Sequence, residues 1–146
     1  MKIIKDVKTN WNLIAWYTIM LVAINLVLSF IPSLFLSIGN ESAIEKISLL
    51  NFLQIVFFAP FFEETLMRGI LQNFLEKKTF LTRKTIYILI ALVFSMLHFD
   101  INFLPYFATS LILSYVYDKT NETLIIPIVI HGLYNLFVTL IICTFN

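Results

Sequence analysis

The sequence predicts an all-α fold, a multi-pass transmembrane helix bundle of about five spans. Of the 146 residues, 60% are hydrophobic and only 13% are charged, and the mean hydropathy is +0.90. Soluble domains typically carry about a quarter charged residues, because their surfaces face water. The charged residues here also gather in a few places and leave long apolar windows between them. Lipid is therefore the expected solvent for most of the surface.

The charged residues divide the chain into five uncharged windows. These are residues 9–40, 47–62, 85–99, 101–117 and 123–146. A helix needs about 20 residues to cross a hydrocarbon core of roughly 30 Å. The first and last windows are long enough alone, whereas the second crosses only if its helix continues through the charged residues that follow, to about Leu75. The third and fourth windows are short and rely on flanking residues, so one of them is a candidate re-entrant segment.

Lysine and arginine residues fall mainly on one side of the predicted bundle, and cytoplasmic loops are enriched in these residues. Five spans place the N-terminus in the cytoplasm and the C-terminus outside, with Lys46 alone on the outer side. The cytoplasmic side then carries Lys2, Lys5, Lys8, Lys77, Lys78, Arg83, Lys84 and Lys119. We expect a single membrane domain over residues 1–146, located in the cell membrane. Its basic N-terminal stretch is interpreted as leading into a retained first span rather than a cleavable signal peptide.

The net charge argues against nucleic-acid binding, and the cysteine content excludes structures that need several cysteines. A net charge of +1 offers no basic surface for nucleic acid, so the expected partner is the lipid bilayer. The single cysteine, Cys143, allows neither an internal disulfide nor a multi-cysteine metal site.

Polar side chains lie inside three of the apolar segments: Glu63, Glu64, Arg68, His98, His131 and Asn135. Ionisable groups at membrane depth are costly and usually functional. At about 1.5 Å per residue, Glu63 and His98 each lie roughly 20 Å from a charged helix end, and His131 and Asn135 lie about 12–20 Å from one. These four residues are therefore expected to share one layer near the middle of the membrane, and one site.

Helical spacing separates the two glutamates. Glu64 and Arg68 are four residues apart on one face and can neutralise each other. Glu63 is rotated by about 100° and is left to face another helix. A carboxylate with no cationic partner in an apolar pocket binds a proton more readily, as a general base must. The alternative is structural: the Glu64–Arg68 pair and the histidines would then only fix the packing of the helices, in a scaffold or transporter accessory.

Three short motifs resemble those of a known family. Residues 63–68, EETLMR, fit the pattern EExxxR, residues 94–98 fit FxxxH, and residues 131–135 fit HxxxN. In this order, each on its own apolar segment, they resemble the CAAX protease and bacteriocin-processing family, also called Abi. Its members are glutamate-dependent intramembrane proteases. The resemblance covers roughly residues 47–143.

The resemblance implies an endopeptidase that hydrolyses a peptide bond of a peptide or membrane protein without a cofactor. Glu63 would be the general base and His98 would help to hold and activate water. His131 and Asn135 would donate to the oxyanion, while Glu64 and Arg68 would support the geometry. A second implication is a bacteriocin self-immunity protein, with or without proteolysis.

A metal-dependent alternative stays open at this stage. Glu63, His98 and His131 could supply the two histidines and one glutamate of a catalytic zinc. The sequence has no HExxH motif and no Gly-x-Ser-x-Gly motif, which disfavours the common zinc and serine hydrolases. We expect the metal-free site, because a zinc site would leave Asn135 without a role.

Overall fold

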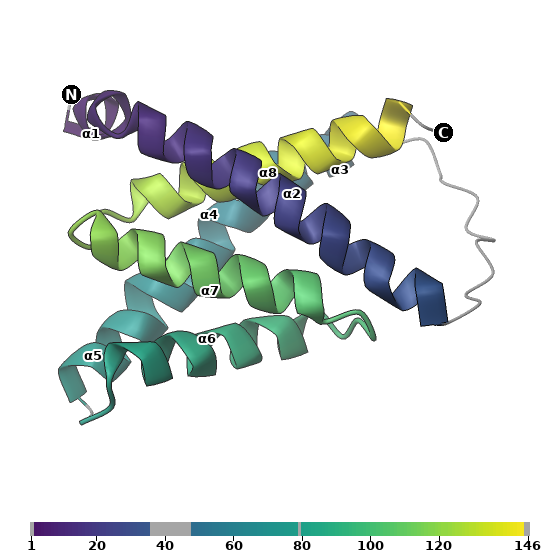
Figure 1. Ribbon diagram of the computed structural model, residues 1–146. Helices are drawn as coiled ribbons and strands as arrows, with labels where there is room; N and C mark the ends of the chain where they lie inside the picture. Colours follow the sequence, from purple (N-terminus) through teal and green to yellow (C-terminus); the bar gives the residue numbers. More distant parts are fainter. Residues whose placement is uncertain (1, 36–47, 79, 145–146) are drawn as a thin grey trace.

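The computed structural model describes residues 2–35, 48–78 and 80–144. Within these residues every regular element is a helix, which confirms the predicted all-α bundle (Figure 1). The predicted outer-side residue Lys46 lies outside the described residues.

Each uncharged window contains one helical segment, and a short helix precedes the first. The elements are α1 (Lys2–Thr9), α2 (Trp11–Phe35), α3 (Leu49–Leu53), η1 (Gln54–Phe58), α4 (Ala59–Glu64), η2 (Thr65–Gln72), α5 (Asn73–Lys78), α6 (Arg83–Leu97), α7 (Leu104–Lys119) and α8 (Ile125–Thr144). The run Leu49–Lys78 is one continuous helix of 30 residues, which we call the glutamate helix. The predicted passage of this helix through the charged motif is therefore confirmed.

Among the residues that the structure describes, three helices are long and apolar enough to cross a membrane: Trp11–Ser29, Leu49–Lys78 and Ile125–Thr144. Helices α6 and α7 have only 15 and 16 residues, short of the roughly 20 that a full crossing requires. The chain is thus a membrane protein, whereas the number of five spans and the cytoplasmic N-terminus stay predictions.

Two segments of the glutamate helix, η1 and η2, are π-helical, so that N–H groups there bond carbonyls five residues back. The N–H of Ala59 donates to the carbonyl of Gln54, and the N–H of Asn73 donates to that of Arg68. Pro60 follows η1 and has no N–H, so this pattern leaves the carbonyl of Ile55 without a donor from its own helix. Wide turns of this kind are rare in proteins as a whole, but those that occur are often found at functional sites.

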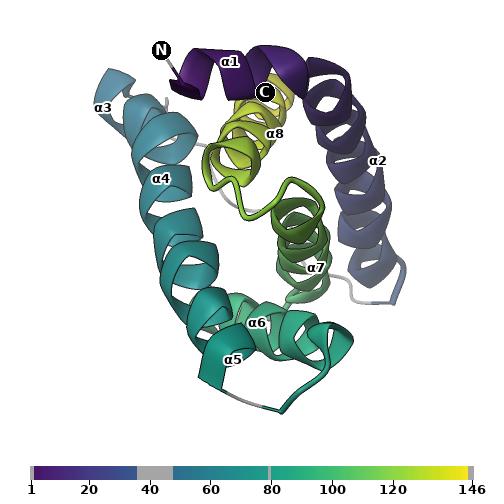
Figure 2. The same cartoon turned by 90° about the vertical axis from the view of Figure 1, so that its left-hand side faces the viewer.

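Helices α7 and α8 lie between the glutamate helix and α2 (Figure 2). One buried apolar cluster joins α2, α7 and α8 through Ile14, Leu21, Leu113, Val116, Ile126 and Ile130. A second joins the glutamate helix to α6 through Met67, Ile86, Ile90 and Phe94, with Tyr106 of α7 against it. Helix α7 therefore contacts both halves of the core.

Polar contacts fix the register of the glutamate helix against α7. Gln72 Nε2 donates to the carbonyl of Ser114 at 3.4 Å, and Asn73 Nδ2 donates to the hydroxyl of Tyr117 at 2.9 Å. In lipid such interhelical bonds orient helices that apolar packing alone would leave free to rotate.

Candidate active site

Glu64 and Arg68 form a fully buried ion pair on the glutamate helix. Arg68 Nη1 lies 3.0 Å from Glu64 Oε1 and 3.0 Å from Oε2, and both side chains are 0% exposed. Arg68 Nη2 also donates to the carbonyl of Ser110 at 2.7 Å and to its hydroxyl at 3.0 Å. The predicted neutralising pair is confirmed, and the structure adds Ser110 of α7 as its anchor.

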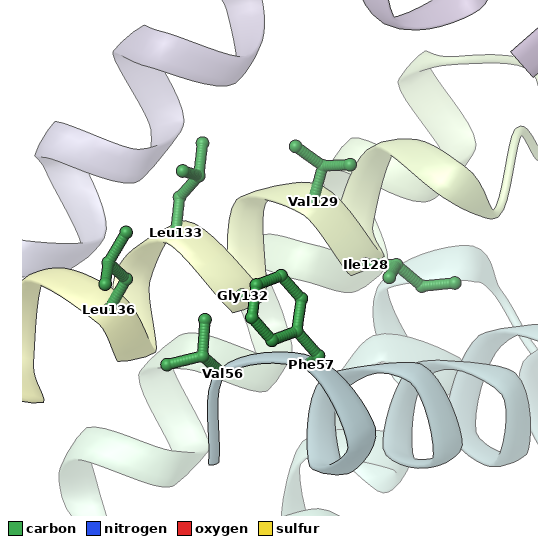
Figure 3. Close-up of a pocket in the computed structure, with 7 residues that line it drawn as sticks. All are labelled: Val56, Phe57, Ile128, Val129, Gly132, Leu133 and Leu136. Atoms are coloured by element: carbon green, nitrogen blue, oxygen red, sulfur yellow. The ribbon is translucent and has the colours of Figure 1, made fainter. Parts of the chain in front are cut away.

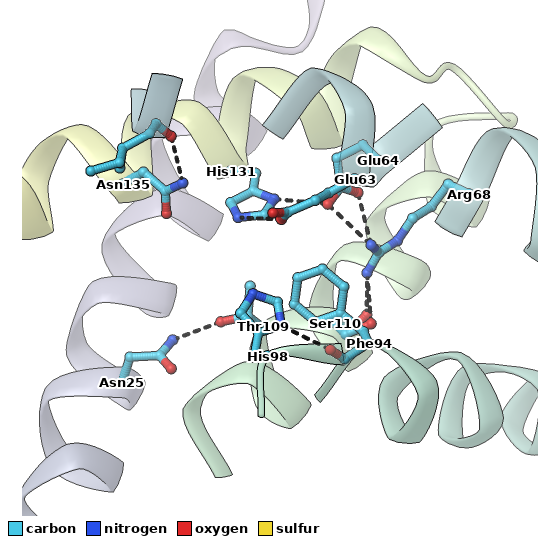
Figure 4. Close-up of polar contacts among 11 residues, drawn as sticks. Asn25, Glu63, Glu64, Arg68, Phe94, His98, Thr109, Ser110, His131 and Asn135 are labelled. Atoms are coloured by element: carbon cyan, nitrogen blue, oxygen red, sulfur yellow. Dashed lines mark hydrogen bonds and ion pairs between the residues drawn. The ribbon is translucent and has the colours of Figure 1, made fainter. Parts of the chain in front are cut away.

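His131 of α8 contacts both glutamates through its two ring nitrogens (Figure 4). Its Nδ1 is 2.8 Å from Glu64 Oε1, and its Nε2 is 3.7 Å from Glu63 Oε2. Because an ionised carboxylate can only accept, Nδ1–H donates to Glu64 and orients the ring so that Nε2 faces Glu63. An unbroken series of polar contacts therefore runs from Ser110 through Arg68, Glu64 and His131 to Glu63.

His98 stands at the C-terminal end of α6, where aromatic rings hold it in place. Its Nδ1 is 2.8 Å from the carbonyl of Phe94, so Nδ1 carries the proton and Nε2 is the acceptor when the ring is neutral. The ring stacks on Tyr106 with centroids 4.1 Å apart and lies 4.6 Å from the Phe94 ring. Phe94 and His98, the two ends of the FxxxH motif, are therefore in direct contact.

Asn135 has a partner that sequence spacing did not indicate. Its Nδ2 donates at 2.9 Å to the carbonyl of Ile55, the group that Pro60 leaves without a donor in η1 (Figure 4). One of the two amide hydrogens of Asn135 is thus used to hold the π-helical turn.

One cavity of about 430 Å³ brings the predicted residues together. Glu63, His98, His131 and Asn135, from three separate segments, all line it. The wall also contains Tyr106, Thr109 and Tyr134, along with apolar residues of the glutamate helix and α8. The shared location is therefore observed, while the catalytic roles stay predictions. The sequence did not indicate Ser110, Thr109, Tyr106 and Tyr134. Residues with a hydroxyl group are common in apolar helices, and no motif distinguishes those that line a site from those that only pack between helices.

The cavity offers no ready metal site. In the part of the chain that the structure describes, no three His, Cys, Asp or Glu side chains converge in a way that could hold a metal ion. Two of the four imidazole nitrogens of His98 and His131 are already bonded within the protein, to Phe94 and Glu64.

Gly132 lets α8 approach η1 more closely than any other residue would. A Cβ atom at Gly132 would lie only 2.8 Å from the carbonyl oxygen of Val56, below normal contact distance. Figure 3 shows Gly132 facing η1, beside a second, apolar cavity of about 330 Å³. His131 and Asn135 flank this contact within α8, so the same approach brings both of them to the glutamate helix.

We expect Gly132→Ala to destabilise the protein by about 1–3 kcal/mol, because the added methyl must push α8 away from rigid backbone. Gly69→Ala is the matched control: its Cβ would meet a flexible side chain, Leu124, at 3.4 Å. Within a helix, that substitution should be neutral or stabilising by about 0.5–1 kcal/mol. Unfolding midpoints of the purified proteins in detergent measure the difference. Equal midpoints for the two variants would contradict the importance of this close approach.

Comparison with protein-family models matches residues 45–137 to the family described as type II CAAX prenyl endopeptidase Rce1-like. The match covers more than half of the chain. It includes all four residues predicted to be catalytic and leaves α1 and α2 outside. Searches of curated proteins and of solved structures find no match.

Proposed function

Because the chain belongs to the type II CAAX prenyl endopeptidase Rce1-like family, a protease family, we propose that it is an intramembrane endopeptidase in which Glu63 activates water. The observation that carries this proposal is the cavity into which Glu63, His98, His131 and Asn135 converge. Of the two adjacent glutamates, Glu63 lines this cavity. Glu64 is instead paired with Arg68 and hydrogen-bonded to His131.

Glu63 acts as the general base in this proposal. It removes a proton from a water molecule as the water oxygen bonds to the carbonyl carbon of the scissile peptide. His98 holds that water through Nε2, because its Nδ1 is occupied by the carbonyl of Phe94. The protonated Glu63 then gives its proton to the leaving amine as the C–N bond breaks, so the enzyme returns to its starting state.

The negative charge that develops on the carbonyl oxygen requires hydrogen-bond donors. His131 supplies an Nε2–H when its ring is protonated between the two carboxylates, and Asn135 supplies the amide hydrogen not used by Ile55. Donors fixed in advance in a low-dielectric site are often the largest single contribution to catalysis. The bond from His131 to Glu64 and the anchoring of Arg68 by Ser110 fix these donors in place.

The substrate class in this proposal is a peptide or a segment of a membrane protein that reaches the cavity from the bilayer. The site lies on helices whose outer faces are apolar, including the exposed residues Phe57, Phe61 and Phe62. A multi-pass location in the cell membrane agrees with this access route.

Comparison of peptide termini in cells that carry the wild type or Glu63→Gln would test the proposal. We expect a set of new N-termini that depend on the wild-type protein and disappear with Glu63→Gln. Glu122→Gln, which changes an exposed carboxylate, should retain them. Identical termini for wild type and Glu63→Gln would overturn the proposal and favour an immunity role without proteolysis.

We expect cleavage to survive strong chelators, because a glutamate base with histidine and asparagine donors does not need a cation. Purified protein should contain well below one equivalent of zinc by elemental analysis. Stoichiometric zinc, with activity that is lost on its removal and restored on its return, would instead favour the alternative of zinc held by Glu63, His98 and His131.

A further inference from the structure

Most basic residues of the chain gather at one end of the bundle, and three contacts hold that end together. Arg83 Nη1 lies 2.6 Å from Asp118 Oδ2, which joins the start of α6 to the end of α7. Lys119 Nζ donates to the hydroxyl of Tyr17 at 3.4 Å, which joins the end of α7 to α2. Val7 of α1 packs against the buried cluster that α2, α7 and α8 share. This basic end, as we call it, carries Lys2, Lys5, Lys8, Lys77, Lys78, Arg83, Lys84 and Lys119.

The basic end has an excess of positive charge. Against its eight basic residues stand four acidic ones, Asp6, Glu76, Asp118 and Glu122, which leaves an excess of four charges. Among the residues that the structure describes, Asp100 is the charged side chain of the opposite end. A cluster of Lys and Arg residues at the edge of a bilayer attracts anionic lipid headgroups.

Helix α1 lies across the basic end rather than along the bundle. Figure 1 shows this helix end-on while α7 and α8 run across the picture, and Figure 2 shows it lengthwise. Ile3, Ile4 and Val7 lie on one side of α1, and its three lysines lie on the opposite side. Ile3 and Ile4 are 59% and 64% exposed, so the protein leaves most of their surface uncovered. An amphipathic helix in this position fits the plane of the membrane surface, with its apolar side toward the acyl chains and its lysines toward the headgroups.

Lys119 is held in place by two tyrosine rings. Its Nζ lies 5.5 Å from the centroid of the Tyr17 ring and 5.6 Å from that of the Tyr115 ring. An ammonium at this distance is attracted by the π-electrons of the ring. Lys119 nevertheless stays exposed, and only one of its three N–H donors is needed for its bond to Tyr17. A fixed and exposed ammonium beside two tyrosines, which are typical of the membrane–water interface, fits a lipid phosphate.

We propose that the basic end is a docking surface for the headgroups of anionic phospholipids, in which α1 lies in the membrane surface and Lys119 binds a lipid phosphate. Arg83 contributes less, because its guanidinium is already paired with Asp118. The inference goes beyond the proposed proteolysis and does not depend on it, since its tests need no peptide substrate.

Lipid binding is measured by fluorescence anisotropy with the purified full-length protein in detergent. The probes are phosphatidylglycerol and phosphatidylcholine with the same labelled acyl chain, because they differ in headgroup charge. We expect the wild type to prefer phosphatidylglycerol and Lys119→Gln to weaken that binding about five-fold, whereas Lys119→Arg should retain it. Lys84→Gln is the matched control, since it removes an exposed cation of the same end that no aromatic ring holds among the described contacts. It should weaken binding by at most about two-fold.

Two results would overturn the Lys119 site: equal affinity of the wild type for both lipids, or equal losses for Lys119→Gln and Lys84→Gln. Potassium phosphate and potassium chloride at equal ionic strength should displace phosphatidylglycerol alike, because both only screen the charges. Selective displacement by phosphate would mean that the site takes free phosphate rather than a headgroup, and would overturn the lipid assignment.

The position of α1 is tested with two cysteine variants in a Cys143→Ser background, which removes the exposed natural thiol. Ile3→Cys and Lys5→Cys place a thiol on opposite sides of α1, about 160° apart. In nanodiscs that contain phosphatidylglycerol, a water-soluble thiol reagent should label Lys5→Cys several-fold faster than Ile3→Cys. In sodium dodecyl sulfate the two should react alike, which controls for thiol reactivity. Equal rates in nanodiscs would contradict a position of α1 in the membrane surface.

Discussion

Glu63→Gln is expected to lower turnover by at least about 10²–10⁴-fold, while the unfolding midpoint stays close to that of the wild type. A general base contributes rate accelerations of this order, and glutamine cannot accept a proton from water. Glu63 is partly exposed to the cavity, and its contact with His131 is long, at 3.7 Å. Few interactions are therefore lost in the folded state. Turnover is measured as cleavage of a fluorescence-quenched peptide that spans a cleavage site found in the comparison of termini. Stability is measured by thermal unfolding in detergent.

Glu122→Gln is the control for removal of a negative charge, since this carboxylate is exposed and does not line the cavity. It should change neither turnover nor the unfolding midpoint. A Glu63→Gln protein that cleaves at the wild-type rate would refute the role of Glu63 as base. If Glu63→Gln unfolds while Glu64→Gln is stable but inactive, the roles of the two glutamates are reversed.

Glu64→Gln is expected to destabilise the protein by about 3–5 kcal/mol, because it leaves the Arg68 guanidinium buried without its counter-charge. It also replaces the carboxylate that accepts from His131 Nδ1. Both members of the pair are 0% exposed, so water cannot compensate. Loss of turnover would follow from loss of the geometry. Unfolding midpoints and denaturant titrations of the purified variants give the free-energy difference.

A double variant distinguishes broken pairing from other causes. Glu64→Gln/Arg68→Met removes both charges and should recover part of the stability lost in Glu64→Gln, since an apolar replacement of a whole buried pair is often nearly neutral. Further destabilisation in the double variant would mean that the contacts of Arg68 with Ser110 dominate over its pairing with Glu64.

The meeting of the polar residues in one cavity could be predicted from the sequence because it depends on depth alone. A count of residues from each charged helix end gives the height of Glu63, His98 and His131, and bundled helices bring side chains of equal height together. The pairing of Glu64 with Arg68 could be predicted as well, since it lies within one helix and requires only a four-residue spacing.

The contacts between helices could not be predicted in the same way. That His131 bridges both glutamates depends on how α8 crosses the glutamate helix, which the close approach at Gly132 sets. The bond from Asn135 to Ile55 depends on a π-helical turn, and the period of apolar residues does not reveal such a turn. The bond from Arg68 to Ser110 depends on the register between two helices, and the two residues that it joins are 42 positions apart in sequence.

The contacts of the glutamate helix with α7 make the number of residues in this helix as important as their identity. Each residue rotates an α-helix by about 100°, so the loss of one residue from α4 would turn everything after it by that angle. Gln72 and Asn73 would then leave α7, although no side chain had been altered. Outward-facing positions such as Leu66 and Ile70, which are 50% and 60% exposed, should accept other apolar side chains. Along this stretch, substitutions at outward-facing positions are expected to be tolerated better than insertions or deletions.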